Sequence, residues 1–567
     1  MRVTGILFAL ALFAFAPSLA LPPDDDAKRP AGLQSPYVPD LFHHQFAPPE
    51  ADPVNGPEAG ELQGLIRDGK LRLRLEDAIR LAVRNNLDVH LQRLEIRDRH
   101  QAYYQSEAPF EPVWSQNFAY AQDKDPSPST VTGIFHNWTR SISTNQVVSK
   151  YFPTGATLAA DISFQRFESN QNQVLFSPSY IGTLTFSFNQ HLLRGRGREV
   201  NRAPVLIARN AWKIAESDFR HKLEQLVLDV EKQYWDVLYA RTDLEVKQES
   251  LRLSEKTRDD TFAQVEAGTQ PELNLYKARA ETARRLQEVI AAETTLRNLQ
   301  QKLLGTLTPA GPPIVGPALA VELEALDPHI EEEPLSFAEA ADRAVERRGD
   351  VRRAKIGLES SEIALKQAKN RLLPALDFSA SYTQHGLKGG LKDLPGVNPD
   401  LIAALNNEFS GNGWESLGQM MRGRYNGFAL QLSLVIPIGN LDARAAYARA
   451  TIDRDYQGAL LDQARQQVVL TLQTVYNNLE RDRGLIAASR EGRVQAEKDL
   501  EGEQAKFEAG VSVIRDLLES QRNLAQARSQ EVLARIAYRK SLLDYYFATA
   551  QLLDKHGIQV APSLERN

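Results

Sequence analysis

The chain has 567 residues, a formal net charge of −6 and no cysteine. The nearly balanced charge gives no reason to expect a nucleic-acid partner. The absence of cysteine excludes disulfides, thiolate metal sites, cysteine catalysis and a lipid attached to an N-terminal cysteine.

The first twenty residues have the layout of a cleavable secretory signal. A basic Arg2 precedes an apolar run from Ile6 to Ala16, and small residues close the segment. The run is short for a membrane span, although an uncleaved anchor is the alternative. No later apolar run approaches 18 residues, so an exported chain of this kind either stays soluble or enters a membrane as a β-barrel. Residues 21–70 are rich in proline and acidic residues and are expected to form an irregular lead-in.

A segment that begins LEDAIRLAVRNNLDV at residue 75 recurs 262 residues later as FAEAADRAVERRGDV. Identical pairs at this offset are Ala78/Ala340, Ala82/Ala344, Val83/Val345, Asp88/Asp350, Val89/Val351, Pro112/Pro374 and Tyr120/Tyr382. A second echo, between 265–283 and 507–525, aligns Gly268 with Gly510 and Leu275 with Leu517. We interpret the chain as a tandem duplication of one unit, with repeats at 71–310 and 335–555, a linker at 311–334 and a tail at 556–567.

Strands are expected at about 113–193 in the first repeat and at about 374–437 in the second. Residues 114–193 contain only eight charged side chains but thirteen aromatic ones, and TLTFSFNQ at 183–190 alternates apolar and polar positions. Such strands suit a barrel wall between lipid and water, with a soluble sandwich as the alternative. Segments 139–149 and 155–168 also look extended, so the first repeat has four strand candidates against two in the second.

Each repeat is predicted to end in a long helical hairpin, at about 203–307 and about 441–553. From Trp212 the apolar positions recur with a mean spacing of about 3.6 residues, as in a coiled coil. This stripe consists of Ala215, Phe219, Leu223, Leu226, Val230, Tyr234 and Val237. The second repeat has a similar stripe from Ile452 through Tyr456, Leu460, Ala464, Val468, Leu472 and Val475 to Leu479. Gly268 and Gly510 are predicted to stop the first helix of each hairpin.

Two strands per repeat cannot close a barrel, and lipid does not tolerate an open sheet edge. Oligomerisation is therefore expected to complete the barrel. Four strands per chain would give twelve in a trimer, whereas the two extra candidates would form either an elaborated loop hairpin or a barrel of eighteen strands.

These features together resemble the TolC-like outer membrane efflux proteins. The resemblance covers nearly the whole chain after the lead-in. It rests on the doubled helical opening, Pro112 and Pro374 before the strands, the exit QHLLRGRGREVNRA at 190–203 and the two hairpin tips. It implies an α+β membrane protein in which a duplicated unit of coiled-coil helices and amphipathic strands forms a trimeric β-barrel continued by an α-helical periplasmic tunnel. Family precedent favours four strands per chain.

The resemblance also implies what the protein does and where. A homotrimer in the outer membrane, extending into the periplasm, would be the passive exit duct of a tripartite efflux or type I secretion system. Its partners would be outer-membrane lipid, a periplasmic adaptor and an inner-membrane pump. No cofactor, no metal and no enzymatic activity are expected, which agrees with the lack of a phosphate loop or nucleophile motif in the sequence.

Site residues carried over from the family lie at the hairpin tips. Asp516 and Glu519 stand six and nine positions after Gly510, where relatives carry acidic residues that form rings at the periplasmic mouth. Residues expected to contact the adaptor are Gly268, Thr269, Gly510, Val511 and Ser512. For Asp516 and Glu519, the alternative interpretation is that they are solvated acidic side chains on an exposed helix face.

The chain departs from the family's residue pattern at one pair of positions, and one alternative function remains open. Where some relatives close the mouth with an Asp in the first tip and an Arg in the second, this chain has Asn274 and Ser512, so that salt bridge is not expected. The rival function is a periplasmic coiled-coil structural or adaptor protein without a barrel. The sequence does not identify the transported substrate.

Overall fold

The structure is a computed structural model that describes residues 66–67, 70–126, 135–171, 174–308, 320–323, 336–392 and 398–558. The expected signal segment at 1–20, most of the lead-in and linker, and the tail from 559 onward lie outside the described residues. Within the described ranges, no helix combines the length and the apolar character needed to cross a membrane.

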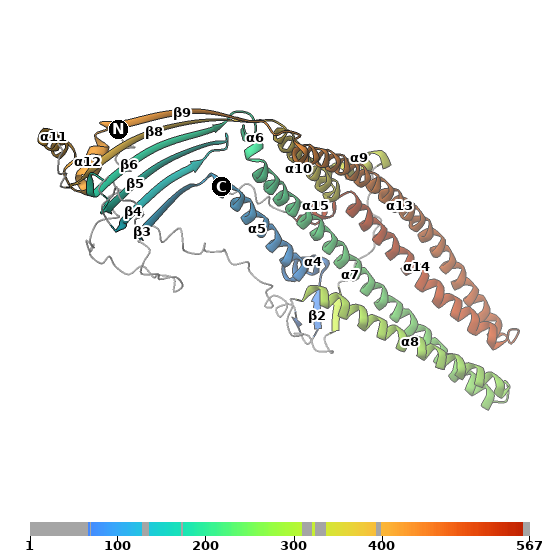
Figure 1. Ribbon diagram of the computed structural model, residues 1–567. Helices are drawn as coiled ribbons and strands as arrows, with labels where there is room; N and C mark the ends of the chain where they lie inside the picture. The colour runs from blue at the N-terminus through green and yellow to red at the C-terminus, as the bar shows by residue number, and fades with distance from the viewer. Residues whose placement is uncertain are drawn as a thin grey trace. The chain divides into compact units, whose positions relative to one another are not determined.

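Six long strands form one antiparallel sheet (Figure 1). The strands are β3 (Pro112–Pro126), β4 (His136–Tyr151), β5 (Ala156–Ser169), β6 (Phe176–His191), β8 (Ala375–Leu391) and β9 (Tyr425–Val435), and they pair in this order. The two strand candidates at 139–149 and 155–168 fall within β4 and β5, which pair with each other and with their neighbours over almost their whole length. They are therefore not a loop hairpin, and the four strands per chain favoured by the family resemblance are too few.

Strand register sorts the side chains of this sheet onto two faces, because alternate residues of a strand point to opposite sides. One face, called here the apolar face, carries most of the large apolar side chains. Among its members are Trp114, Phe118, Leu158, Phe164, Leu184, Phe186, Phe188, Tyr382, Phe428, Leu430, Leu432 and Leu434. The opposite, polar face carries mainly Ser, Thr, Asn and Gln, such as Thr185 and Thr383, whose hydroxyl oxygens lie 3.2 Å apart. Many side chains of the apolar face are exposed, with Phe118 at 70% and Phe428 at 80%.

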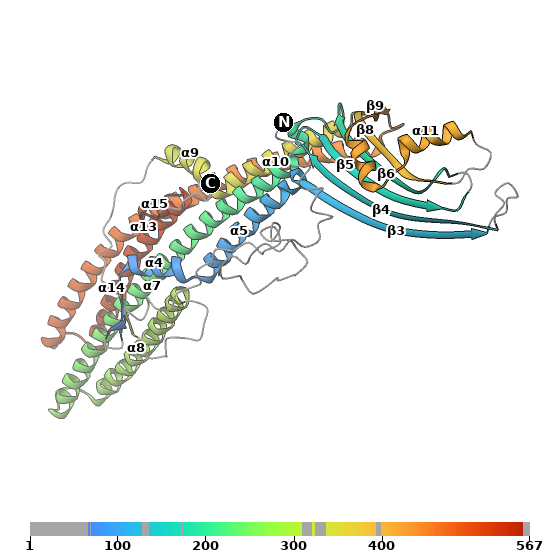
Figure 2. The ribbon, with the colours of Figure 1, turned by 90° about the vertical axis from the view of Figure 1, so that its left-hand side faces the viewer.

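Two short helices between β8 and β9 lie at the end of the sheet away from the long helices (Figure 2). They are α11 (Pro399–Phe409) and α12 (Gly413–Met421). Helix α12 packs on the apolar face over Gly182 and Gly386, which are paired across β6 and β8. Ser416 donates a hydrogen bond to the Tyr180 carbonyl at 2.9 Å, which fixes α12 to the β6 backbone. Met420 of α12 is almost fully buried against the sheet, beside Gly182.

The repeated sequence openings fold into matching helix pairs. Helices α4 (Leu75–Asn85) and α5 (Leu87–Glu107) correspond, at the same offset, to α9 (Phe337–Arg347) and α10 (Gly349–Arg371). Ala78 and Ala82 in α4, like Ala340 and Ala344 in α9, are buried. These small side chains, which occur in both repeats, let each short helix pack closely on the long helices.

Two long hairpins complete the helical part. The first is α7 (Ala203–Glu266) with α8 (Glu272–Leu307), preceded by α6 (Arg198–Asn201), and the second is α13 (Leu441–Glu508) with α14 (Ile514–Ala548). The stripe predicted on α7 is confirmed, since all its members are buried except the partly buried Phe219. On α13 the stripe is buried at Val468, Leu472, Val475 and Leu479, whereas Ile452 and Tyr456 are exposed. A small sheet of β1 (Ile66–Arg67), β2 (Lys70–Leu73) and β7 (Ala320–Leu323) joins the segments before the two repeats.

The main apolar core lies where α4, α7, α8 and the end of the chain meet. Helix α15 (Leu552–Lys555) contributes Leu552 and Leu553, both fully buried. His556 Nε2 lies 2.9 Å from Glu231 Oε2, and Glu231 is fully buried. This contact ties the end of the chain to the middle of α7.

We expect His556→Ala to destabilise the protein by about 2 kcal/mol or more, because it leaves the buried Glu231 carboxylate without its nearest partner. Arg347→Ala is the matched control, since it breaks an ion pair to Asp554 that is more than half exposed on both sides, and it should cost less than about 1 kcal/mol. Thermal unfolding of the detergent-solubilised variants measures both. Equal unfolding temperatures would contradict the buried pair.

Gly386→Ala should displace α12 from the sheet. A Cβ atom at Gly386 would lie 2.1 Å from the Ser416 carbonyl oxygen and 2.9 Å from the Met420 nitrogen, both backbone atoms that cannot rotate away. Gly427→Ala in β9 is the control, because nothing lies within 4 Å of its Cβ position. Hydrogen exchange of residues 413–421 should accelerate only in the Gly386 variant. Unchanged exchange there would show that α12 is not held by this contact.

Candidate functional site

Both hairpin tips are built in the same way. Gly268 and Gly510 have φ angles of +74° and +73° and follow the last turns of α7 and α13. The next amides close the turn, with Thr269 N donating to the Gln264 carbonyl and Val511 N donating to the Lys506 carbonyl, at 2.9 and 3.0 Å. This paired arrangement of a left-handed residue and a six-to-one hydrogen bond is the Schellman motif, and it satisfies the last carbonyls of each helix. The two glycines therefore end the helices, as the sequence predicted.

The residues after each glycine differ in exposure. Gly268, Thr269, Gly510 and Val511 are exposed, and Ser512 is half-buried because its hydroxyl bonds to Glu503. Two turns further on, Leu275 and Leu517 occupy equivalent buried positions within their hairpins. At both tips, the residues of the turn face solvent, and a buried leucine two turns further on packs inside the hairpin.

The predicted acidic pair lies on the first turns of α14. Asp516 and Glu519 are 42% and 55% exposed. Each has an arginine neighbour, since Arg515 Nε lies 2.9 Å from Asp516 Oδ1 and Arg522 lies 3.7 Å from Glu519 Oε1. The hydrogen bond and charge of Asp516 raise the pKa of the Arg515 guanidinium, which favours its cationic form. The negative field of the acidic pair is partly compensated within the same helix.

Helices α8 and α14 form a groove near the tips, and this groove has a volume of about 350 Å³. Its lining residues are Lys277, Ala280, Glu281 and Arg284 of α8, with Arg515, Leu518, Glu519 and Arg522 of α14. Four of these side chains are cationic and two are acidic. Sequence reasoning missed these cations, although both helices carry a basic, acidic, basic pattern at positions i, i+4 and i+7, which places three side chains on one helix face.

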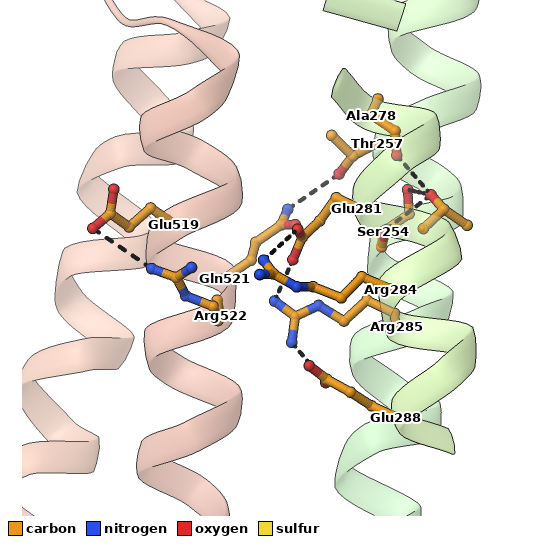
Figure 3. A network of polar contacts seen from close by, with 11 residues as sticks. Ser254, Thr257, Ala278, Glu281, Arg284, Arg285, Glu288, Glu519, Gln521 and Arg522 are labelled. Carbon is orange, nitrogen blue, oxygen red and sulfur yellow. Dashed lines mark hydrogen bonds and ion pairs between the residues drawn. The ribbon is translucent and has the colours of Figure 1, made fainter. Parts of the chain in front are cut away.

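Buried polar contacts lie beside the groove, within and between the neighbouring helices (Figure 3). The Gln521 amide of α14 donates to the Thr257 hydroxyl of α7 at 3.1 Å and so joins the two hairpins. Arg285, only 4% exposed, is held by Glu281 and Glu288 at 2.7 and 3.1 Å. Ser254 and Thr282 meet at 3.0 Å between α7 and α8. The Gln521–Thr257 and Ser254–Thr282 contacts thus link α14 and α8 through α7, whereas the Arg285 ion pairs lie within α8.

No catalytic arrangement accompanies these residues in the described part of the chain. No group of three or more metal-ligating side chains occurs among the described residues. What the tips can do chemically is present rigid turns and a charged groove to another molecule.

The fold and the sequence were compared with known proteins. The family model described as outer membrane efflux protein matches residues 340–551. Outer membrane protein TolC of Vibrio cholerae serotype O1 is 23% identical over 387 residues, covering 65% of this chain and 79% of that protein. Outer membrane protein TolC of Escherichia coli K12 is 22% identical over 334 residues, covering 59% of this chain and 63% of that protein. Among solved structures, the Campylobacter jejuni CmeC outer membrane channel has a TM-score of 0.58 at 12% identity, over 97% of this chain and 99% of that one.

The α+β fold, with a six-stranded antiparallel sheet and two long helical hairpins, is that of outer membrane channels. The sequence matches agree with the fold: residues 340–551 match the outer membrane efflux protein family, and the chain is similar, at 22–23% identity, to outer membrane proteins named TolC.

Gly268→Ala and Gly510→Ala should each destabilise a tip by about 1–2 kcal/mol, because a Cβ atom is disfavoured at these positive φ angles. Gly502→Ala, in the regular part of α13 with nothing within 4 Å of its Cβ position, is the control and should stabilise by about 0.5–1 kcal/mol. Limited proteolysis at the tips and thermal unfolding report both effects. Identical behaviour of all three variants would refute the Schellman turns.

Proposed function

We propose that the protein is the outer-membrane exit duct of a tripartite efflux or type I secretion system, acting as a passive trimeric channel with no enzymatic activity. The observation that carries this proposal is the sheet with one exposed apolar face, one polar face and two strands, β6 and β9, that lead into the long hairpins. Such a sheet suits a wall between lipid and an aqueous lumen.

The sheet edges support a trimer. Strands β3 and β9 are each paired on one side only within the described residues. Open edges are not tolerated in lipid, and six strands are too few to close a barrel. Edge-to-edge pairing of β9 with β3 of the next subunit would give eighteen strands in three copies. The exposed Ile452 and Tyr456 of the α13 stripe would then be covered by the neighbouring subunit.

The long hairpins supply the periplasmic conduit in this proposal. At 1.5 Å per residue, the 64 residues of α7 extend about 96 Å. No globular core needs helices of this length, whereas a duct across the periplasm does. The barrel would therefore continue into a tunnel of twelve long helices in the trimer.

The hairpin tips would meet a periplasmic adaptor, which connects the duct to an inner-membrane pump. Gly268, Thr269, Gly510, Val511 and Ser512 are the proposed contact residues, because they are the outermost groups of rigid turns. The groove between α8 and α14 lies beside them and would accept charged side chains of the adaptor.

Asp516 and Glu519 would form two rings of three carboxylates at the periplasmic mouth. Their effect on ions is reduced by Arg515 and Arg522, which would surround the same opening. We therefore propose a mouth that prefers cations modestly, since close opposite charges weaken each other's field.

Single-channel conductance in a planar bilayer tests the duct. We expect the wild type to insert as a trimer and to pass cations in preference to anions. Asp516→Asn/Glu519→Gln should lower that preference, and Arg515→Gln/Arg522→Gln should raise it, because the two pairs have opposite charge. A protein that stays in buffer without detergent and never conducts would favour a periplasmic coiled-coil protein. Channels with unaltered selectivity in both variants would retain the duct and remove these residues from the mouth.

A further inference from the structure

The sheet separates ionised side chains by sign between its two faces. On the polar face, the acidic residues Asp123, Asp125, Asp161 and Asp377 occur without any Lys or Arg among the described strand residues. The apolar face carries Lys124, Arg140, Lys150, Arg166 and Lys388 with a single acid, Glu168. Cations on a face that is otherwise apolar need a partner outside the chain or a polar layer to reach.

The cations of the apolar face are concentrated at one end. Lys124, Arg140 and Arg166 lie on β3, β4 and β5 at the end away from the helices, in three successive cross-strand rows. Lys388 shares the Arg166 row but donates to the backbone carbonyls of Glu408 and Ser410 at 3.0 and 3.2 Å, so it is used within the chain. At the helix end, Lys150 is the one cation of this face within the described strands.

Glu168 holds two of the cations side by side. It lies opposite Arg140 across β4 and β5, with Arg140 Nη1 at 3.6 Å, and it also contacts Arg166 of its own strand. Both guanidinium groups remain more than 40% exposed, whereas Glu168 is 15% exposed. The cluster formed by Lys124, Arg140, Arg166 and Glu168, called here the rim cluster, therefore has a net charge of +2 and presents its cations outward.

The rim cluster lies at the level where lipid chains would give way to headgroups. The exposed apolar side chains of β9 end at Phe428, and from Phe428 to Ile436, just after the strand, the chain extends about 27 Å, which matches a lipid-facing band. Above that band, α12 covers the apolar face over β6 and β8, and the rim cluster replaces apolar side chains on β3 to β5. Strands of 14 to 17 residues exceed the 9 to 11 needed to span the apolar layer.

Aromatic side chains at the same level support this placement. Tyr120 and Tyr180 lie in the Arg166 row, and Trp138 lies beneath Arg140, whose guanidinium carbon is 6.0 Å from the ring centre. Trp414 of α12 is 65% exposed. Tyr and Trp gather at membrane interfaces, where the ring meets lipid and the polar edge meets water.

We infer that the rim cluster binds the phosphate groups of the outer-leaflet lipid, a phosphorylated glycolipid. This rests on the proposed function, because the helix-free end of the sheet faces the outer leaflet only if the sheet spans the outer membrane. Two adjacent guanidinium groups and an ammonium group match phosphate monoesters, which accept paired N–H donors and carry more than one negative charge. The single Lys150 at the opposite end gives no comparable site for the inner leaflet.

The test is binding of hexa-acylated bis-phosphoryl lipid A to the detergent-solubilised trimer, compared with the same lipid after removal of both phosphates. Native mass spectrometry measures the bound fraction. We expect the wild type to bind the phosphorylated form about tenfold more tightly, and Lys124→Gln/Arg140→Gln/Arg166→Gln to lose most of that preference. Lys150→Gln, on the same face at the other end, should retain it. Raising the salt concentration should weaken the preference in the wild type.

A second variant distinguishes the loss of positive charge from misfolding as the cause of weaker binding. Glu168→Gln raises the net charge of the rim cluster from +2 to +3 and should increase the phosphate preference severalfold. Equal binding of the two lipids by the wild type, or an unchanged preference in both the triple variant and Glu168→Gln, would overturn the inference.

Conductance in a bilayer of phosphatidylcholine separates this inference from the proposed function. Channels that conduct normally but bind both forms of lipid A equally would leave the duct standing and remove the lipid site. A wild type that neither inserts nor conducts would overturn the duct and the lipid site together.

Discussion

The hydrogen-bonding requirement of the sheet backbone is the constraint on which the rest of the structure depends. Each interior strand pairs with a neighbour on both sides, although β9 covers β8 only from Ala375 to His385, and the long pairing of β3 with β4 fixes fifteen residues in one register. Because side chains alternate along a strand, that register places every apolar side chain of one parity on one face. A slip of one residue would move Phe186 and Phe188 to the polar face. The outer strands β3 and β9 leave the same requirement unmet, which makes a single copy of this sheet incomplete in lipid.

The duplicated unit shows which parts of the fold are fixed and which are free to vary. In both repeats, two short helices, a first strand, a last strand and a long hairpin keep their order and nearly their spacing. The segment between the first and last strand differs, since the first repeat inserts β4 and β5 and the second inserts α11 and α12. β4 and β5 extend along the whole sheet, whereas α11 and α12 lie at its end away from the long helices. Neither insertion changes the first and last strands of a repeat, which are the strands that connect to the helices.

Strong periodic patterns made much of this structure predictable. The long helices, their buried stripe at Val230 and Tyr234, and the helix stops at Gly268 and Gly510 follow from local spacing and backbone conformation. Helices α11 and α12 were not among the predicted elements, because at 11 and 9 residues each offers only a few turns of helical periodicity. Their signals are nonetheless present: Pro399 follows a capping Asn398, and Asn412 with Glu415 forms a capping box.

The candidate site was less predictable than the fold, because it depends on contacts between segments distant in sequence. Asp516 and Glu519 could be identified from their distance to Gly510, but nothing local indicates that Arg522 faces the same groove as Arg284. That arrangement depends on how α8 and α14 pack, which is set by Gln521 and Thr257 across 264 residues. The strand count was ambiguous for a related reason: β4 and β5 have strand-like sequences, but only their pairing on both sides makes them part of the sheet.

The contacts between the two hairpins change in kind along their length. Near the middle of α7, large apolar side chains such as Trp235 and Val237 belong to the main core. Between α7 and α14, polar pairs recur at several levels, with Lys232 near Asp544 at 2.5 Å, Ser529 bonded to Asp243 at 2.6 Å and Gln521 bonded to Thr257. Toward the tips, a small cluster of Ala278, Ile514 and Leu518 is the apolar contribution. A hydrogen bond exchanged for water costs little, whereas separating apolar surfaces costs free energy in proportion to the area exposed. The hairpins are therefore held together most firmly near the main core and most weakly at the tips, the end at which a duct of this kind would have to open.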